Sequence, residues 1–324
     1  MACKSPLFHP TSLKADRAYQ FRVFNSILKH CVFSLPNIPP KLAPSTLFLP
    51  VITTSHSPLY ECDYNFHKSN STYFSDLDVT RSHLVCCLLQ PGIDKLHHNA
   101  KEKLVLDKEG HAVRGAWSIP LGGVMCAFKR EIGMYQGFEM WSRLLCWDRK
   151  WIYVVSHFVK KGTVRPTSYV LSDGTWFGLG GKGYQVSKGA VTEGEVGDVD
   201  VDVDEKAIYA SAISKYVVKL GRLTIHPEVL LQASNLLPER PGGWHTMSRA
   251  SGESTPETLV EIEEASNIDV KEGETTDEWD WKRIVAENEK GLKYVEHFAA
   301  LDGLHSEFSG GRTAALGKYR DFLW

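Results

Sequence analysis

The sequence lacks an excess of charge of either sign, a Cys-x-x-Cys motif and a long uninterrupted apolar run. Its 37 lysines and arginines nearly balance its 39 aspartates and glutamates, giving a formal net charge of −2. No broad electrostatic field therefore indicates a nucleic-acid partner. The seven cysteines are scattered and odd in number, which argues against a disulfide framework and a structural zinc site. We expect a protein of a reducing, cytoplasmic setting, with no metal and no other cofactor.

Neither a secretory signal nor a transmembrane segment is expected. Residues 1–16 have no continuous apolar core. Residues 18–33 predict an amphipathic helix, but Arg22 and Lys29 lie within it, which argues against a membrane span. We expect this helix to pack on the domain or on a partner subunit, with peripheral membrane attachment as the alternative. The prolines of residues 36–50 then predict an extended connector.

The most informative stretch is residues 60–89. Polar and aromatic side chains with catalytic potential gather in its first part: Asp63, Asn65, His67, Asn70 and Tyr73. A strand-like piece, residues 59–64, precedes a polar turn. Apolar residues at helical spacing then predict a helix of about five turns over residues 71–89. Ser and Asn residues at 69–71 are good N-caps, so the helix start presents backbone N–H groups to the preceding loop. Such a combination suits a site where negative charge develops on a carbonyl oxygen.

The same residues resemble the hotdog-fold thioesterases, the 4-hydroxybenzoyl-CoA thioesterase-like superfamily. Asp63, Tyr73 and Arg81 keep the spacing of the bacterial acyl-CoA members. The Asp-x-Asn-x-His pattern of residues 63–67, followed by Asn70 and Tyr73, matches the plant acyl-carrier-protein thioesterases. The amino-acid sequence of residues 61–78 is most similar to that of fungal thioesterases of secondary-metabolite gene clusters, such as the leucinostatin cluster. A more distant similarity is to the animal thioesterase-superfamily member six.

This resemblance implies a thioesterase acting on acyl-CoA, or on acyl or polyketide chains held by an acyl carrier protein of a synthase, in secondary-metabolite biosynthesis. The alternative is a catalytically silent hotdog that binds such a chain or a partner protein. Asp63 is the expected general base or carboxylate nucleophile. His67 would donate to the carbonyl or position water, and Asn65 would orient either group. A homodimer with sites at the subunit boundary is also implied.

Substrate binding is expected at the start of the helix. Backbone N–H groups of Asn70, Ser71 and Thr72 would polarise the thioester oxygen. Tyr73 is either a substrate contact or a core aromatic residue of the helix. Arg81 and Asp78 are three residues apart, which predicts a structural ion pair.

The remaining pattern predicts an α+β hotdog fold, in which a curved antiparallel sheet wraps around one long central helix, with helical extensions at both ends. Strands are expected at residues 117–132, 137–148, 151–159 and 207–220. A polar loop is expected over residues 94–115, and an amphipathic helix over residues 278–308.

The predicted domain organisation has three parts. Residues 1–57 form a helix and a connector, and residues 58–222 form a single hotdog with an insertion at 161–205. Residues 223–324 form an irregular acidic segment and the C-terminal helix. The glycine-rich run of 176–183 lacks the ending of a phosphate-binding loop, and the acidic run of 198–204 lacks the glycine of a calcium loop. Both are therefore expected to be ordinary loop.

Overall fold

The computed structural model describes residues 10–33, 38, 43–107, 109–166, 169–171, 205–238 and 279–300. Its centre is a seven-stranded antiparallel sheet in which β1, β4, β5, β6 and β2 follow one another, while β3 and β7 also pair with β6. The strands are β1 (Val51–His56), β2 (Trp117–Ser118), β3 (Leu121–Phe128), β4 (Gly137–Trp147), β5 (Trp151–Lys160), β6 (Ile208–Leu220) and β7 (Leu223–Ile225).

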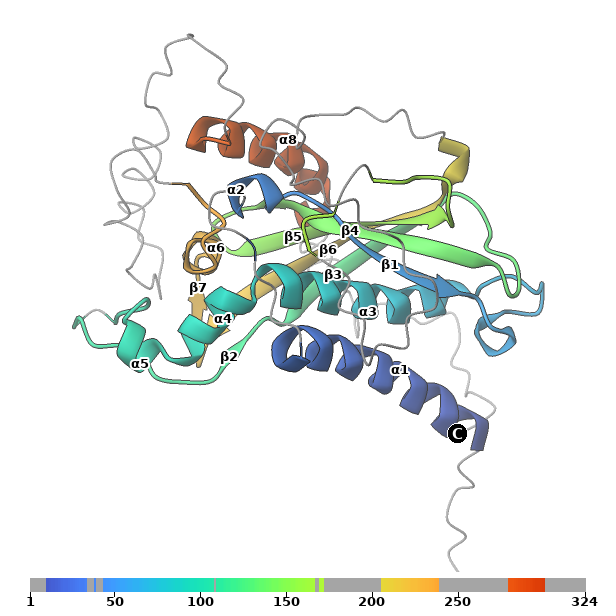
Figure 1. Cartoon of the computed structure of the whole chain (residues 1–324), viewed down its shortest axis with the longest axis horizontal. Helices are drawn as coiled ribbons and strands as arrows, with labels where there is room; N and C mark the ends of the chain where they lie inside the picture. Colours follow the sequence, from blue (N-terminus) through green and yellow to red (C-terminus); the bar gives the residue numbers. More distant parts are fainter. Residues whose placement is uncertain are drawn as a thin grey trace, which may run out of the picture.

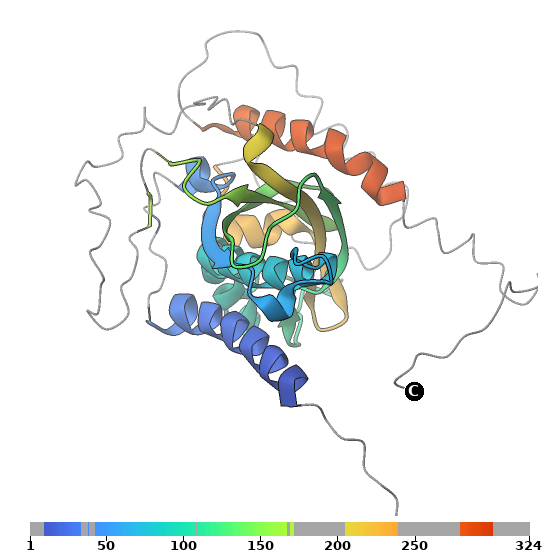
Figure 2. The ribbon, with the colours of Figure 1, turned by 90° about the vertical axis from the view of Figure 1, so that its right-hand side faces the viewer.

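The sheet curls around helix α3 (Asn70–Leu88), as the view along that helix shows (Figure 2). The chain therefore has the α+β hotdog fold that the sequence predicts. Its layers follow one another as helix α8 (Trp281–Ala300), the sheet, α3 and helix α1 (Pro10–Leu28) (Figure 1). The outer helices are the two predicted helical extensions.

Period-two alternation decides which side chains of the sheet face α3. On β5, Ile152, Val154 and Phe158 belong to the core against α3, whereas Tyr153 and Val155 pack on the α8 side. A tight turn joins β4 and β5. Asp148 accepts hydrogen bonds from the backbone N–H groups of Lys150 and Trp151 through its Oδ1, at 2.6 and 2.7 Å.

Helix α8 lies directly on strand β4. A Cβ atom at Gly291 would stand 2.5 Å from the carbonyl oxygen of Leu145, so glycine permits this close approach. The side chain of Asn288 accepts from the backbone N–H of Trp147 at 2.7 Å and donates to its carbonyl at 3.1 Å. These contacts fix α8 on the face of the sheet that is turned away from α3.

Helix α1 covers the side of α3 that the sheet leaves open. Tyr19 donates to Asp78 at 2.8 Å, and Arg22 pairs with the buried Asp76 at 2.6 Å. Further along, the rings of His30 and His83 are joined by a 2.9 Å hydrogen bond. The expected packing of this helix on the domain is confirmed.

Several local expectations are wrong. Leu59–Glu61 is a 3₁₀ turn rather than part of a strand, because Glu61 and Cys62 donate to carbonyls only three residues back. The first strand, β1, lies instead at the end of the expected connector, where it pairs with β4 ahead of the expected domain start at residue 58. The expected connector also contains a short helix, α2 (Ala43–Thr46), which includes Pro44.

The stretch after α3 is more helical than predicted. Pro91 lies in the first turn of a new helix, α4 (Gln90–His97), where its missing N–H costs nothing. Helix α5 (Asn99–Glu102) follows, so the expected loop over 94–115 is partly helical. Helix α6 (Pro227–Ala233) likewise begins a segment expected to be irregular. The glycine-rich and acidic runs at 176–183 and 198–204 lie outside the described residues. Among those described, no helix is both long and apolar enough to cross a bilayer.

Candidate active site

The Asp-x-Asn-x-His stretch folds into a miniature hairpin. Cys62 and Lys68 form an antiparallel bridge, and the N–H of Asp63 donates to the carbonyl of His67 at 2.9 Å. The turn between them is closed by Asp63 itself, whose Oδ1 accepts the N–H of Asn65 at 2.9 Å. Phe66 adopts a left-handed backbone with φ of 61°, which reverses the chain at this point.

The hairpin places the two main candidate side chains on one face. Asp63 and His67 stand opposite each other, and directly opposed residues of an antiparallel pair have Cβ atoms roughly 4.5–5.5 Å apart. The side chain of Asp63 is exposed in the single chain. His67 is half-exposed, and its Nδ1 lies 3.0 Å from a carboxylate oxygen of Glu131. The hairpin thus places Asp63 and His67 on opposite arms with Asn65 in the turn between them, while the side-chain partner of the imidazole is Glu131.

The opposite face of the hairpin points into the protein. The Lys68 side chain is fully buried, and its Nζ lies 2.5 Å from Glu61 and 2.7 Å from Asp76. It also lies over the rings of Tyr73 and Phe138, at 5.5 and 5.4 Å from their centroids. This lysine was not predicted as an anchor. The alternation of the hairpin was the available signal, because it directs Lys68 inward once His67 faces outward.

A second loop holds the hairpin from the side. His67 forms a bridge with Gly133, the N–H of Lys68 donates to Ile132 at 2.8 Å, and Met134 donates to Phe66 at 3.1 Å. The arm of residues 66–68 therefore lies between residues 61–63 and residues 132–134 and is hydrogen-bonded to both. This rigidity matters because catalytic groups act only when held in position.

Helix α3 begins immediately after the hairpin. Ser69 is its N-cap but makes no capping bond with its side chain. The N–H and the hydroxyl of Thr72 both donate to the carbonyl of Ser69, at 3.0 and 2.7 Å. The Thr72 amide, one of the three expected to polarise the thioester oxygen, is thus already hydrogen-bonded within the first turn. The N–H groups of Asn70 and Ser71 have no intrahelical acceptor, by the geometry of a helix start.

Tyr73 is a core residue. It is 2% exposed, and its ring packs against Phe128 and Phe158 with centroid separations of 5.0 and 4.8 Å. Burial raises the pKa of its phenol well above the ordinary value. In the single chain these contacts match the packing reading of Tyr73 and not the substrate-contact reading. The ion pair predicted between Arg81 and Asp78 is present.

An exposed apolar surface surrounds Asp63. Tyr64 is 89% exposed, Tyr60 67% and Tyr135 62%, and Leu59 and Phe66 are also largely in contact with solvent. Aromatic side chains gathered on one loop cluster indicate a surface that another molecule covers. In the described part of the single chain, no hydrogen bond joins Asp63 to Asn70 or Ser71.

Comparison with known proteins identifies relatives over most of the chain. The profile of the Thioesterase-like superfamily matches residues 57–215. "Thioesterase poxG" of Penicillium oxalicum is 37% identical over 276 residues, which span 84% of this chain and 74% of the relative. "Probable thioesterase atnL" of Emericella nidulans is 31% identical over 311 residues, spanning 94% and 86%. The structure of the gentisyl-coenzyme A thioesterase BH1999 aligns with 56% of this chain and 98% of its own, at 12% identity and a TM-score of 0.31.

Proposed function

The chain belongs to the thioesterase-like superfamily, and on that premise we propose that it hydrolyses acyl thioesters carried on coenzyme A or on the phosphopantetheine arm of an acyl carrier protein. Its similarity to fungal thioesterases supports a role in secondary-metabolite biosynthesis. The observation that carries the proposed site is the miniature hairpin, in which Asp63 and His67 occupy opposite positions of the two arms beside the start of α3.

In this proposal Asp63 activates the attacking water, or attacks the thioester carbonyl itself. The N–H groups of Asn70 and Ser71 stabilise the negative charge that develops on the carbonyl oxygen, aided by the positive end of the helix dipole. His67 donates a hydrogen bond or positions the water, and its Glu131 partner orients the ring. Asn65 holds the turn that presents Asp63.

A second copy of the chain completes the site in this proposal. In the described sheet, β3 pairs only with β6 and leaves its other edge open. Leu121, Met125 and Phe128 of this edge strand are 40–44% exposed, and long apolar edges of this kind tend to pair with another strand. Phe128 also touches Tyr73 in the first turn of α3. A partner paired along β3 would therefore lie next to the hairpin and exclude water from Asp63.

Hydrolysis of a panel of acyl-CoA thioesters, followed with a free-thiol reagent, tests the proposed chemistry. We expect Asp63→Asn to lower kcat by about 10²- to 10⁴-fold, the usual contribution of a positioned general base. Asp107→Asn is the matched control, because Asp107 also closes a turn, accepting the N–H groups of Glu109 and His111. Equal rates for Asp63→Asn and the wild type would remove Asp63 from the mechanism. No cleavage of any thioester, together with a raised melting temperature on adding an acyl ligand, would favour the silent hotdog.

A further inference from the structure

A layer of buried polar side chains crosses the interface between α3 and the sheet and divides its core in two. We call it the polar belt; its members are Thr80, Arg81, Ser142, Ser156 and Ser214, each 2% exposed or less. On α3 the belt lies between Leu77 of one apolar cluster and Leu84 of the other. Each serine likewise interrupts the inward-facing apolar residues of β4, β5 or β6.

Hydrogen bonds link the members of the belt, but one buried donor of the belt has no acceptor among the described residues. Ser142 lies 3.0 Å from the hydroxyl of Thr80 and 2.6 Å from that of Ser156. Arg81 donates to Ser214 at 2.6 Å through Nη1 and pairs with Asp78 through Nη2. The Nε–H of Arg81 is buried and has no hydrogen-bond partner in the described part of the chain. A buried donor without a partner costs free energy, so its presence calls for an explanation other than stability.

Stability does not account for the belt as a whole. Replacing buried polar groups by apolar side chains of similar volume is often neutral or stabilising. Five polar residues at one level, contributed by four different elements, therefore indicate a role in recognition. The groups available are hydroxyls and a guanidinium, which bind an oxygen atom.

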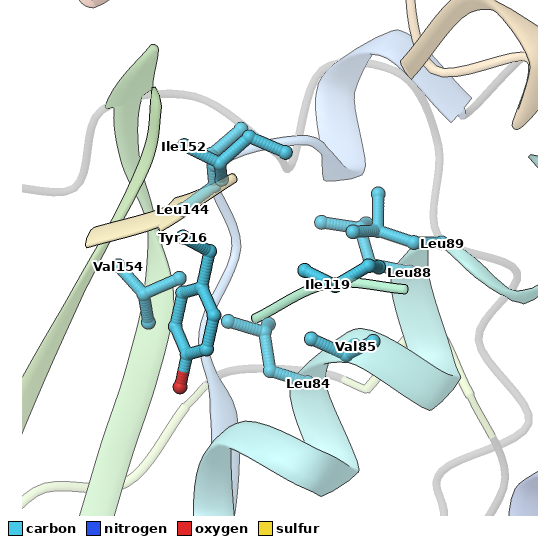
Figure 3. A pocket seen from close by; sticks show the side chains of 9 residues that line it. All are labelled: Leu84, Val85, Leu88, Leu89, Ile119, Leu144, Ile152, Val154 and Tyr216. Atoms are coloured by element: carbon cyan, nitrogen blue, oxygen red, sulfur yellow. The ribbon is translucent and has the colours of Figure 1, made fainter. Parts of the chain in front are cut away.

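An apolar cavity of ≈ 20 Å³ adjoins the belt on the side of the C-terminal half of α3 (Figure 3). It is lined by Leu84, Val85, Leu88, Leu89, Ile119, Leu144, Ile152, Val154 and Tyr216. Three of these, Leu144, Val154 and Tyr216, lie two residues from a serine of the belt on the same face of their strands. The guanidinium of Arg81 lies 5.7 Å from the centroid of the Tyr216 ring. The cavity thus suits a small apolar group, and a chain that ends there has the belt beside it.

The position of the belt along α3 sets the length of a chain that would reach it. From Asn70 to Arg81 the helix rises about 16 Å, and to Leu84 about 21 Å. Between them, β6 and β3 present small side chains toward α3, namely Ala210, Ala212 and Cys126. A chain that is attached to a thioester at the hairpin and runs along this side must therefore be long to meet the belt.

We propose that the polar belt selects long acyl chains that carry a hydroxyl or keto oxygen in their distal half, with Arg81 and Ser214 contacting that oxygen and the cavity holding the chain end. This inference rests on the proposed hydrolysis of acyl thioesters. It names a substrate class, the oxygenated long-chain acyl thioester, and the residues that recognise it.

The test compares three thioesters with the full chain: butyryl-CoA, stearoyl-CoA and 12-hydroxystearoyl-CoA. We expect the wild type to prefer the hydroxylated long chain over stearoyl-CoA by about tenfold in kcat/KM, as one hydrogen bond to a charged group provides. Ser214→Ala should lower kcat/KM for 12-hydroxystearoyl-CoA to about the value for stearoyl-CoA, with a smaller loss for butyryl-CoA, because the short chain does not reach the belt. Ser156→Ala should reduce the preference less than Ser214→Ala does, because it leaves Ser214, the hydrogen-bond partner of Arg81, in place. Ser211→Ala is the matched control, since Ser211 lies on the same strand but faces His157 on the other side of the sheet.

Equal kcat/KM values for the two long chains with the wild type would overturn the proposal, as would an equal loss on all three substrates with Ser214→Ala. Melting temperatures measured with 12-hydroxystearic acid and with stearic acid distinguish a failure of this proposal from a failure of the proposed hydrolase function. If no thioester is cleaved but the hydroxylated acid alone stabilises the wild type and not Ser214→Ala, the belt is a recognition site in a protein that is not a hydrolase. If both acids shift the melting temperature equally, the belt does not recognise the hydroxyl oxygen of the chain.

Discussion

Replacing Lys68 by Met removes the charge that ties the candidate active-site hairpin to helix α3. The Lys68 ammonium is fully buried between Glu61 and Asp76, at 2.5 and 2.7 Å. Methionine keeps most of the apolar stem, so the change isolates the loss of the ammonium group from the loss of packing.

The expected cost follows from what the substitution leaves behind. The Asp76 side chain is 1% exposed and keeps its 2.6 Å contact with Arg22, whereas Glu61, at 14% exposure, can reach water more easily. Breaking a buried ion pair costs about 3–5 kcal/mol when one partner remains unpaired. Because both carboxylates retain some compensation, we expect a loss of about 3 kcal/mol in the free energy of unfolding.

Urea unfolding followed by circular dichroism measures this loss for Lys68→Met, Asp76→Asn and the double variant. The double variant should lose at least about 1 kcal/mol less than the sum of the single losses, because both substitutions break the same pair. Lys290→Met is the control, since Lys290 is 63% exposed and pairs with Glu287 on the surface of α8. Its loss should be about 0.3–0.5 kcal/mol.

A loss below about 1 kcal/mol for Lys68→Met, or additive losses in the cycle, would refute the reasoning. Either result would mean that the hairpin does not depend on the buried ammonium. The same variant should also lose kcat/KM in the folded state, because the strand that carries Lys68 also carries His67.

Two further predictions concern assembly and pH. Met125→Lys should place a charge on the open edge of β3. Analytical ultracentrifugation should then show a monomer, and the thioester assay should show no activity. Tyr294→Lys on α8 should change neither result. An active wild-type monomer would contradict this. Burial lowers the pKa of His83 from 6.5 to about 4, so between these values the unfolded chain binds a proton that the folded chain does not. The free energy of unfolding should fall by up to about 3 kcal/mol as the pH drops from 6.5 to 4, and His83→Gln should flatten that profile; an unchanged profile would exclude His83 as the cause.

Local sequence patterns predicted the regular elements because each element is set by short-range chemistry. The period-two alternation of residues 151–159 defines both faces of β5, and the apolar spacing after Asn70 defines the central helix. The turn at Asp148 follows from a side chain that bonds its own backbone. The expectation of a loop after the central helix failed because one residue supports two structures: Pro91 cannot continue α3, yet it fits the first turn of the next helix.

The sequence by itself determined the hotdog fold and the residue types of the candidate site, since the spacing of Asp63, Asn65 and His67 is visible in the chain. Only the tertiary structure decided which of these side chains face each other, because the hairpin depends on contacts with Ile132 and Met134, which lie more than sixty residues away. The same holds for Lys68 and the polar belt. Their partners come from separate helices and strands, and no local pattern in the sequence determines which buried polar groups meet across a folded core.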